Sequence, residues 1–469
     1  MALAIPIGVC ALAVLVLVVD LVPGSGSRRG AAAVAAAGLS LLFAGSWLVP
    51  EASALSGAFK NDAFSTYVAR MVLGAGVLAA LGMIDHAETR FPRRHGEYLL
   101  LLLASVCGMT LLAGARELVT LVVAFELMGI PLYAMAALHK TTRLGNEGAI
   151  KLYVAGAISA AITAYGLSFV IGASGETGFD ALRAVRTPLV GLGAMLMLAG
   201  MAYKLGAVPF HGWVADTYQG APAPFVAFLS VAPKVAGLAA LARLLWTAFP
   251  GLSAHWSPVL LALAVLSMGL GNLLAIPQAN VRRLLAYSGI GHIGLLLLAV
   301  VIGHKAGIEA MVFYLATYVA ANMGAFFVAE AVEASGTGAP ADGEIVAFNG
   351  LARRNPGLAL AMLLFLLSLG GIPFVAGFWG KLVLFKNLWL AGHPWLVLAG
   401  ALLTVVGLFY YLRVGRAIYI EPPAVADPVR VGAAVRLAIV LAAIVTVGMG
   451  IYPRPFIEAA AEAGQVLRR

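Results

Sequence analysis

The chain has 469 residues, of which 62% are hydrophobic and 11% are charged, and its formal net charge at pH 7 is +9. Soluble domains are about 45–50% apolar and about 25% charged, so this composition excludes a soluble fold. The basic residues fall mostly in the predicted loops, where lipid headgroups are their expected partners, so the positive charge does not indicate a nucleic-acid partner.

Apolar runs of about 20 residues recur along the whole chain, which is the length that an α-helix needs to cross a hydrocarbon core about 30 Å thick. The 54 glycines favour a helix bundle over a β-barrel, because small residues let membrane helices approach closely. We therefore predict an all-α integral membrane protein with about fourteen transmembrane helices. In chain order the predicted spans cover residues 2–22, 31–50, 67–84, 97–114, 117–138, 148–172, 188–210, 224–248, 257–276, 284–303, 308–331, 357–388, 394–419 and 432–452.

Lysine and arginine concentrate in alternate loops between these spans. The residues concerned are Arg28, Arg29, Arg90, Arg93, Arg94, Lys140, Arg143, Arg282, Arg283, Arg353, Arg354, Arg413 and Arg416. By the positive-inside rule these loops are cytoplasmic. With an even number of spans, both termini are then expected on the periplasmic side of a bacterial inner (plasma) membrane.

Two predicted spans carry the same interruption. The seventh contains LGAVPF with Pro209, and the twelfth contains LGGIPF with Pro373. Each proline lacks a backbone donor and clashes with the carbonyl four residues earlier, that of Leu205 or Leu369, so both helices are expected to break there. Broken helices at membrane depth are tolerated beside a cavity or other protein. Matched breaks in two halves are typical of transporters with internal repeats, whose ion sites lie near the midplane.

Four of the charged side chains within these apolar spans are the strongest candidates for function. Glu126 and Lys234 lie about ten residues into the fifth and eighth spans, which places both near the centre of the bilayer. A charge there costs about 2.5–3.5 kcal/mol on insertion scales, so each is expected to face a partner or a hydrated cavity. Lys204 and Lys381 lie beside the two predicted breaks, where unpaired carbonyls attract water.

Two histidines and one further lysine are weaker candidates for the same chemistry. His211 follows the first break and His292 lies in the middle of the tenth span, and a histidine titrates close enough to neutrality to pass protons between lysines. Either histidine can equally be a satisfied core residue. Lys151 begins the sixth span near the cytoplasmic surface, where the alternative to proton transfer is an interfacial anchor.

The buried charges admit two interpretations. The first is a salt bridge, for instance between Glu126 and Lys204, that only holds helices together. The second is a relay of protons, or of sodium ions: burial lowers the pKa of a lysine and a nearby carboxylate raises it, so a movable glutamate can switch a lysine between holding and releasing a proton. We favour the second interpretation.

Neither a metal site nor a redox cofactor site is predicted in this chain. Cys10 and Cys107 lie in apolar spans without a CxxC pattern, and we interpret them as small apolar residues. The segment GIGHIG, from Gly289 to Gly294, matches the dinucleotide fingerprint, but it lies within an apolar helix and follows no strand. Its glycines therefore indicate helix packing.

With these residues in view, the chain resembles the subunit N family of NADH-quinone oxidoreductase (complex I), the counterpart of mitochondrial NADH dehydrogenase subunit 2 and one of the antiporter-like membrane subunits. The stretch AFLSVAPKVA is similar to subunit N in particular, since the related L and M subunits have a histidine-containing version there. The segments that carry the resemblance are AFELMGIPLYAMAAL with Glu126, NEGAIKLYVAGA with Lys151, YKLGAVPFHGWVADTYQGAPAPFVAFLSVAPKVAGLAAL with Lys204, His211 and Lys234, RRLLAYSGIGHIG with His292, and GLARRNPGLALAMLLFLLSLGGIPFVAGFWGK with Lys381.

The resemblance implies an organisation and a role for each site residue. It implies N-terminal helices 1–3 in residues 1–96, two inverted repeats in 97–256 (helices 4–8) and 257–420 (helices 9–13), and helix 14 with the tail in 421–469. Glu126 and Lys204 match the glutamate of helix five and the lysine of helix seven. Lys234 matches the central lysine and Lys381 the lysine of the outlet half-channel, while His211 and Lys151 match lesser positions.

The implied function is proton translocation, as a membrane-arm subunit, coupled to electron transfer from NADH to quinone in other subunits. The resemblance implies partners similar to subunits M, K, J, A and L, and it places NADH, FMN, iron–sulfur clusters and quinone in partner subunits. Three alternatives remain: a self-sufficient or Mrp-like cation/proton antiporter, a membrane-arm subunit whose charges are only structural, and a subunit of a related donor-specific or hydrogenase complex.

Overall fold

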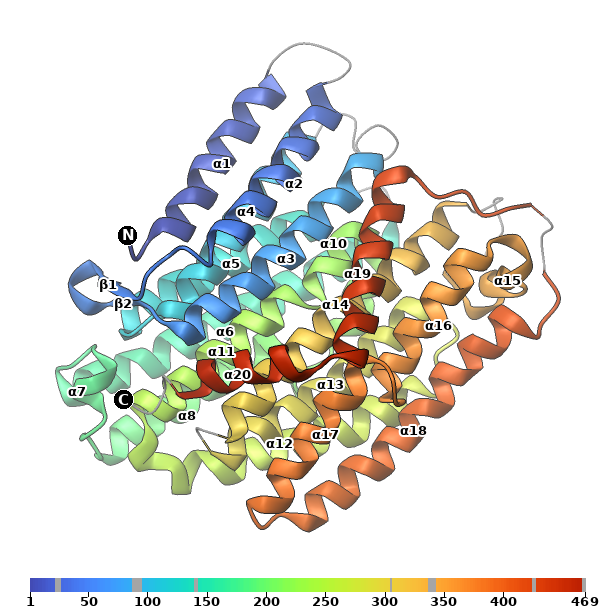
Figure 1. The fold of residues 1–469 in the computed structure, drawn as a ribbon. Helices are drawn as coiled ribbons and strands as arrows, with labels where there is room; N and C mark the ends of the chain where they lie inside the picture. The colour runs from blue at the N-terminus through green and yellow to red at the C-terminus, as the bar shows by residue number, and fades with distance from the viewer. Residues whose placement is uncertain are drawn as a thin grey trace.

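The computed structural model describes residues 1–21, 27–86, 95–138, 142–303, 306–335, 343–423 and 427–465. Within these ranges the chain is almost entirely helical (Figure 1). The described strands, β1 (Ala52–Ala54) and β2 (Phe59–Asn61), form an antiparallel hairpin in which Ser53 pairs with Lys60. The expected all-α membrane fold is confirmed.

Twelve helical segments of the described chain are long and apolar enough to cross a membrane. Two further segments, α2 (Ser27–Gly45) and the broken pair α16 (Pro356–Gly370) and α17 (Ala376–Leu390), bring the structure into agreement with the predicted fourteen spans. The twelve are α1 (Ala4–Leu21), α3 (Ala63–His86), α4 (His95–Gly114), α5 (Leu118–Ala136), α6 (Arg143–Ser174), α8 (Pro188–Leu205), α10 (Ala223–Leu229) with α11 (Ala232–Arg243) and the π-helix η2 (Leu244–Ala248), η3 (Pro250–Leu252) with α12 (Ser253–Ala275), α13 (Val281–Ile302), α14 (Ala306–Ala334), α18 (Pro394–Tyr419) and α19 (Ala433–Ile451).

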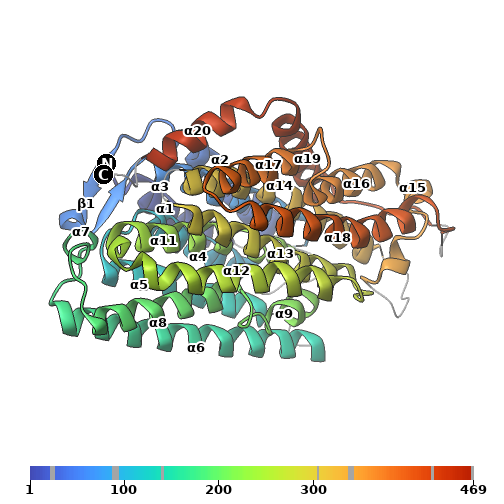
Figure 2. The same cartoon turned by 90° about the horizontal axis from the view of Figure 1, so that it is seen from below.

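The short elements are η1 (Leu55–Gly57), α7 (Phe179–Leu182), α9 (Val214–Gly220), η4 (Ile345–Phe348), α15 (Leu351–Arg354) and α20 (Arg454–Gln465). Most of them lie at the two ends of the bundle, whereas α20 lies across its side, against α3 and α14 (Figures 1 and 2). In Figure 1 the beginning of α1, the hairpin and the end of α20 lie at one end of the bundle, whereas α15 lies at the other. Both termini are therefore at the same end, as an even number of spans requires.

The spans run side by side, and the most buried of them lie in the centre (Figures 1 and 2). Every residue in the apolar window of 223–248 is buried, and so is 94% of the window in α14. In contrast, only 28% of the window in α18 and 33% of those in α1 and α6 are buried. The central helices are thus shielded from lipid, and they carry the polar residues that lipid would not tolerate.

Glycines set the closest helix contacts, as the composition predicted. A side-chain carbon at Gly108 on α4 would lie 2.4 Å from the backbone nitrogen of Met128 on α5, and one at Gly271 on α12 would lie 2.4 Å from that of Gly291 on α13. No residue with a side chain fits at such separations, so these helix pairs touch backbone to backbone.

Both predicted breaks are present, and each helix ends at or next to the residue whose carbonyl the proline was expected to obstruct. α8 ends at Leu205 rather than continuing to residue 210, and Gly206 follows it in the left-handed region with φ of 71°. α16 ends at Gly370, and Gly371 follows with φ of 80°. The prediction placed Gly206 inside the helix and was wrong, because a glycine that adopts a positive φ ends a helix before the proline does.

The eighth span contains a third break that was not predicted. α10 ends at Leu229, and α11 begins at Ala232 after Ser230 and Val231. Pro233 lies in the first turn of α11, where its missing N–H has no helical acceptor in any case. This proline therefore begins a helix and does not interrupt one.

The predicted basic loops are only partly within the described residues. Arg90, Arg93, Arg94, Lys140 and the side chain of Arg28 lie outside them. Among the described ones, Arg282 is not a loop residue exposed to headgroups but the second residue of α13. It is 7% exposed, forms an ion pair with Glu333 of α14, and donates a 3.0 Å hydrogen bond to the carbonyl of Ala221.

A second buried ion pair joins the N-terminal helices to the centre. Asp62, which precedes α3, accepts two hydrogen bonds from Arg243 of α11, at 2.9 and 2.7 Å, and the side chains are 0% and 1% exposed. Burial raises the pKa of Asp62, but the guanidinium of Arg243 and hydrogen bonds from Ser65 lower it more, so it lies below its ordinary value.

Candidate functional site

Glu126 and Lys204 form the ion pair that their positions predicted. Nζ of Lys204, in the last turn of α8, donates to Oε1 of Glu126 on α5 at 3.1 Å and to the carbonyl of Phe125 at 2.9 Å. The ammonium also lies 4.0 Å from the centroid of the Phe125 ring. A side-chain carbon at Gly129 would lie 2.4 Å from Nζ, so the pair depends on a glycine one turn along α5.

Lys234 is buried at the third break, not in the middle of a continuous helix. It lies in the first turn of α11 and is 4% exposed. Its Nζ is 3.5 Å from the hydroxyl of Tyr318 on α14, and it is 5.8 and 5.7 Å from the ring centroids of Tyr218 and Tyr318. A hydroxyl and two aromatic faces therefore surround the ammonium.

One cavity connects Lys204 with Lys234. It lies between α5, α6, α8, α10 and α11, and both lysines line it together with the aromatic side chains of Tyr133, Tyr203 and Trp213. The hydroxyl of Tyr133 is buried and has no hydrogen-bond partner among the described residues. A polar group of this kind accommodates a water molecule, so the cavity is suited to hold water between the two lysines.

His292 lies on the far side of Lys234, between three tyrosines. Its Nδ1 is 2.7 Å from the hydroxyl of Tyr314, its Nε2 is 3.2 Å from that of Tyr411, and its ring centroid is 5.1 Å from that of Tyr318. The hydroxyl of Tyr411 also hydrogen-bonds to Oγ of Ser288. Both ring nitrogens thus have hydroxyl partners, and the imidazole adjoins the residue that contacts Lys234.

Lys381 lies at the twelfth span's break and is 6% exposed. Its Nζ donates a 2.8 Å hydrogen bond to the carbonyl of Leu369, in the last turn of α16. It lines a second cavity, whose polar lining also includes Asn272, Ser288, His292, Tyr410 and Tyr411. The structure therefore places Lys204 and Lys234 on one cavity and His292 and Lys381 on another, with Glu126 paired to Lys204 and Tyr318 in contact with both Lys234 and His292.

His211 is not part of this arrangement. It lies in the turn between α8 and α9, is half-buried, and is absent from the lining of both cavities described above. Its Nδ1 is buried without a hydrogen-bond partner in the described part of the chain. The sequence could not show this position, because it depends on where α8 ends.

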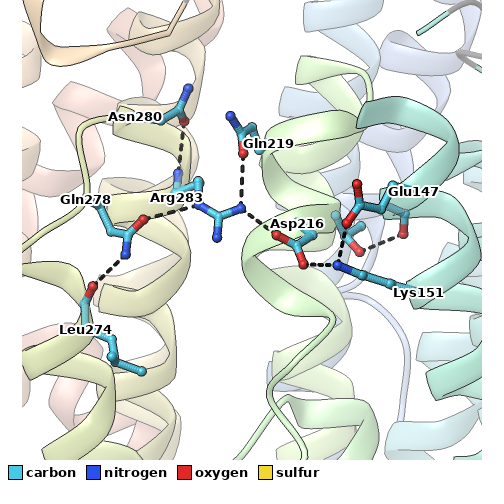
Figure 3. A network of polar contacts seen from close by, with 10 residues as sticks. Glu147, Lys151, Asp216, Gln219, Leu274, Gln278, Asn280 and Arg283 are labelled. Atoms are coloured by element: carbon cyan, nitrogen blue, oxygen red, sulfur yellow. Dashed lines mark hydrogen bonds and ion pairs between the residues drawn. The ribbon is translucent and has the colours of Figure 1, made fainter. Parts of the chain in front are cut away.

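Lys151 also lines neither cavity and belongs to a polar network with Asp216 and Arg283 (Figure 3). Its Nζ contacts Glu147 at 2.6 Å and Asp216 at 2.5 Å, and its side chain is 40% exposed. Asp216, on α9, lies between Lys151 of α6 and Arg283 of α13, with 2.5 Å from its Oδ1 to Nη1 of Arg283 (Figure 3). Burial raises the pKa of Asp216, but hydrogen bonds from these two cations lower it below its ordinary value.

Sequence reasoning missed the tyrosines and Asp216. Tyr314, Tyr318 and Asn322 follow one another at intervals of four residues on α14, which places them on one helix face. That spacing of polar groups in an apolar span was a usable signal. Asp216 gave no comparable signal, because a single carboxylate between spans is ordinary.

The transmembrane family model described as "NADH:quinone oxidoreductase/Mrp antiporter, TM" matches residues 115–407. The chain is 43% identical to NADH-quinone oxidoreductase subunit N of Moorella thermoacetica, over 93% of this chain and 92% of that protein. A solved chain of respiratory complex I from Thermus thermophilus with bound aureothin is 32% identical, with a TM-score of 0.83 over 98% of this chain and 99% of that one.

A chain of the Mrp complex from a Dietzia species has a TM-score of 0.88 over 99% of this chain and 97% of that one. At 20% identity this likeness concerns the fold alone. The matches to subunit N, in contrast, cover nearly the whole of both chains at higher identity. The chain therefore belongs to the subunit N family of NADH-quinone oxidoreductase, among the antiporter-like membrane subunits.

Proposed function

We propose that this chain translocates protons in the membrane arm of NADH-quinone oxidoreductase, driven by electron transfer from NADH to quinone in other subunits. The observation that carries the proposal is the line of titratable and hydroxyl groups from Glu126 to Lys381. A helix bundle needs no such line for stability, since buried polar groups in membrane helices are costly and usually mark an ion pathway.

The first step takes place at Glu126 and Lys204. The carboxylate favours the protonated form of the lysine, so a movement of α5 or α8 that separates the pair makes Lys204 release its proton. The cavity beside Lys204 leads to Lys234, which then accepts the proton through water. Restoring the ion pair draws a new proton to Lys204.

The second step passes from Lys234 to Lys381. The hydroxyl of Tyr318 bridges Lys234 to the neighbourhood of His292, and Tyr411 continues into the cavity that Lys381 lines. A histidine with a hydroxyl at each ring nitrogen passes a proton by accepting it at one nitrogen and releasing it from the other. Lys381 then delivers the proton to the outside.

Protons enter through the network around Lys151 and Asp216. Leu152, next to Lys151, and Trp213, one helical turn before Asp216, both line the cavity of Lys204 and Lys234. The network thus lies beside the mouth of that cavity. We assign His211, which follows α8 in the same region, to this inlet.

The remaining assignments follow from the family. We place the end of the bundle that holds Arg283, α15 and the basic residues in the cytoplasm, and the termini in the periplasm of a bacterial inner membrane. Residues 97–256 and 257–420 form the two inverted repeats, preceded by the helices in 1–96 and followed by the segment 421–469. NADH, FMN, iron–sulfur clusters and quinone bind partner subunits, and the neighbours of this chain are the M-, K-, J-, A- and L-like subunits.

The test is Lys204→Ala in the complete complex, with assembly checked on native gels. We expect an assembled complex in which proton pumping is lost and NADH-driven quinone reduction falls with it, while Lys386→Ala, an exposed lysine of α17, leaves both unchanged. Unchanged pumping in an assembled Lys204→Ala complex would contradict the proposal. Repeating the assay with and without sodium distinguishes protons from sodium ions as the coupled species.

A further inference from the structure

The two cysteines of this chain contact each other across two helices that lie far apart in sequence. Sγ of Cys10, on α1, is 3.4 Å from Sγ of Cys107, on α4. The sequence contains no other cysteine. The expectation that both are merely small apolar residues did not foresee that they meet, because 97 residues separate them.

The pair is reachable from the membrane but not freely from water. Cys10 is exposed on this chain and Cys107 is 4% exposed. Cys10 lies about 9 Å along α1 from its first residue, at 1.5 Å per residue. The exposed residues around it are apolar, with Ile7 at 61% and Val14 at 62%. A reagent must therefore be membrane-permeant to reach the two sulfur atoms.

Cys107 adjoins a close contact between α4 and α5. Its neighbour Gly108 is the residue whose side-chain carbon would collide with the backbone of Met128, and Ser105 donates a 2.9 Å hydrogen bond to the carbonyl of Met128. Glu126 precedes Met128 by two residues on α5. A displacement of α4 at Cys107 is thus transmitted directly to the helix that holds the carboxylate of the Glu126–Lys204 pair.

We propose that Cys10 and Cys107 are a redox-modification site, at which a membrane-permeant two-electron oxidant forms a disulfide between α1 and α4. Each thiol loses its proton and together they give two electrons to the oxidant. With diamide as the probe, the N=N bond takes up both protons and both electrons and becomes a hydrazine. A disulfide needs about 2.05 Å between the sulfur atoms, so closing the bond draws the two helices together.

Oxidation should therefore shift α5 through α4 and lower proton pumping. This consequence rests on the proposed function of Glu126 and Lys204, whereas formation of the disulfide does not. The experiment treats the complete complex in membranes with diamide and denatures it in the presence of N-ethylmaleimide, so that every free thiol is blocked. It then reduces the protein and labels the released thiols with iodoacetamide. Mass spectrometry of the peptides with Cys10 and Cys107 reads the pairing, and pumping is measured before oxidation, after it, and after dithiothreitol.

We expect iodoacetamide on both cysteines of the oxidised wild type, and N-ethylmaleimide on the remaining cysteine in Cys10→Ser and in Cys107→Ser. We also expect a loss of pumping that dithiothreitol reverses and that neither serine variant shows. N-ethylmaleimide on both cysteines of the diamide-treated wild type would overturn the site. A disulfide with unchanged pumping would overturn the transmission to α5, and because Lys204→Ala is assayed in the same membranes, this result is distinct from a failure of the proposed function.

Discussion

Lys381 donates its hydrogen bond to the carbonyl of Leu369, the same group that Pro373, four residues later, cannot satisfy within the helix. The helix break and the buried lysine are therefore two parts of one arrangement. Lys204 differs, because its ammonium has a carboxylate partner as well as a carbonyl. One lysine is thus held by an opposite charge, whereas the other, within the described part of the chain, is held by a backbone carbonyl alone.

Replacing Lys381 with methionine is expected to abolish pumping while the complex still assembles. Methionine is similar in length and apolar, so the helices around it keep their packing, but it carries no proton. The matched control is Lys386→Met on the same helix, whose side chain is exposed. Proton uptake by vesicles during NADH oxidation measures the effect, and normal uptake in Lys381→Met would exclude this lysine from the pathway.

Tyr318→Phe is expected to slow pumping by up to about tenfold, since one hydrogen-bonded step is lost and a net hydrogen bond is worth about 0.5–1.5 kcal/mol. The ring and its contact with His292 remain. Tyr165→Phe, at an exposed tyrosine of α6, serves as the control. If both variants pump at the same rate, Tyr318 does not bridge Lys234 to His292.

Gly129→Ala is expected to disrupt the Glu126–Lys204 pair, because the added carbon would lie 2.4 Å from Nζ of Lys204. Pumping should fall, and stability should decrease by about 1–3 kcal/mol as the crowded side chains move apart. Gly172→Ala on α6 meets no atom within 4 Å and should change neither property. Equal pumping by the two variants would show that the position of the lysine is not critical.

Asp62→Asn is expected to lower the free energy of unfolding by about 3–5 kcal/mol, because it leaves Arg243 buried without its counter-charge. Asp180 forms an ion pair with Arg116, but its side chain is 76% exposed. Asp180→Asn should therefore lower the free energy of unfolding by only about 0–1 kcal/mol. Thermal inactivation of the purified complex compares the two. A smaller decrease in stability for Asp62→Asn than for Asp180→Asn would show that the buried Asp62–Arg243 ion pair does not stabilise the fold.

The contribution of Asp62 to the free energy of unfolding should also depend on pH. Its pKa in the folded chain lies below the ordinary value of about 3.9. The stabilisation is therefore complete above the ordinary pKa and is lost as the pH falls through the lower, folded one. The difference in inactivation temperature between wild type and Asp62→Asn should stay constant from neutral pH to about 5 and narrow in stronger acid.

The spans and the two proline breaks could be predicted from the sequence, because each depends on local chemistry. Hydrophobic length marks a span, and a proline marks a break. The break at Ser230 and Val231 was not predicted, since AFLSVAPKVA contains no glycine that would end the helix and its proline, Pro233, begins α11. The contact of Tyr318 with Lys234 could not be predicted either, because it depends on how α14 packs against α11.

α14 has a further consequence for how the two halves of the pathway work together. It carries both Tyr318, beside Lys234, and Tyr314, beside His292, and it packs against α10, α13, α16, α17 and α19. A translation or rotation of this single buried helix would lengthen the Tyr318–Lys234 and Tyr314–His292 contacts at the same time. A displacement of α14 would thus interrupt proton transfer at Lys234 and at His292 together, with no change in the position of any lysine.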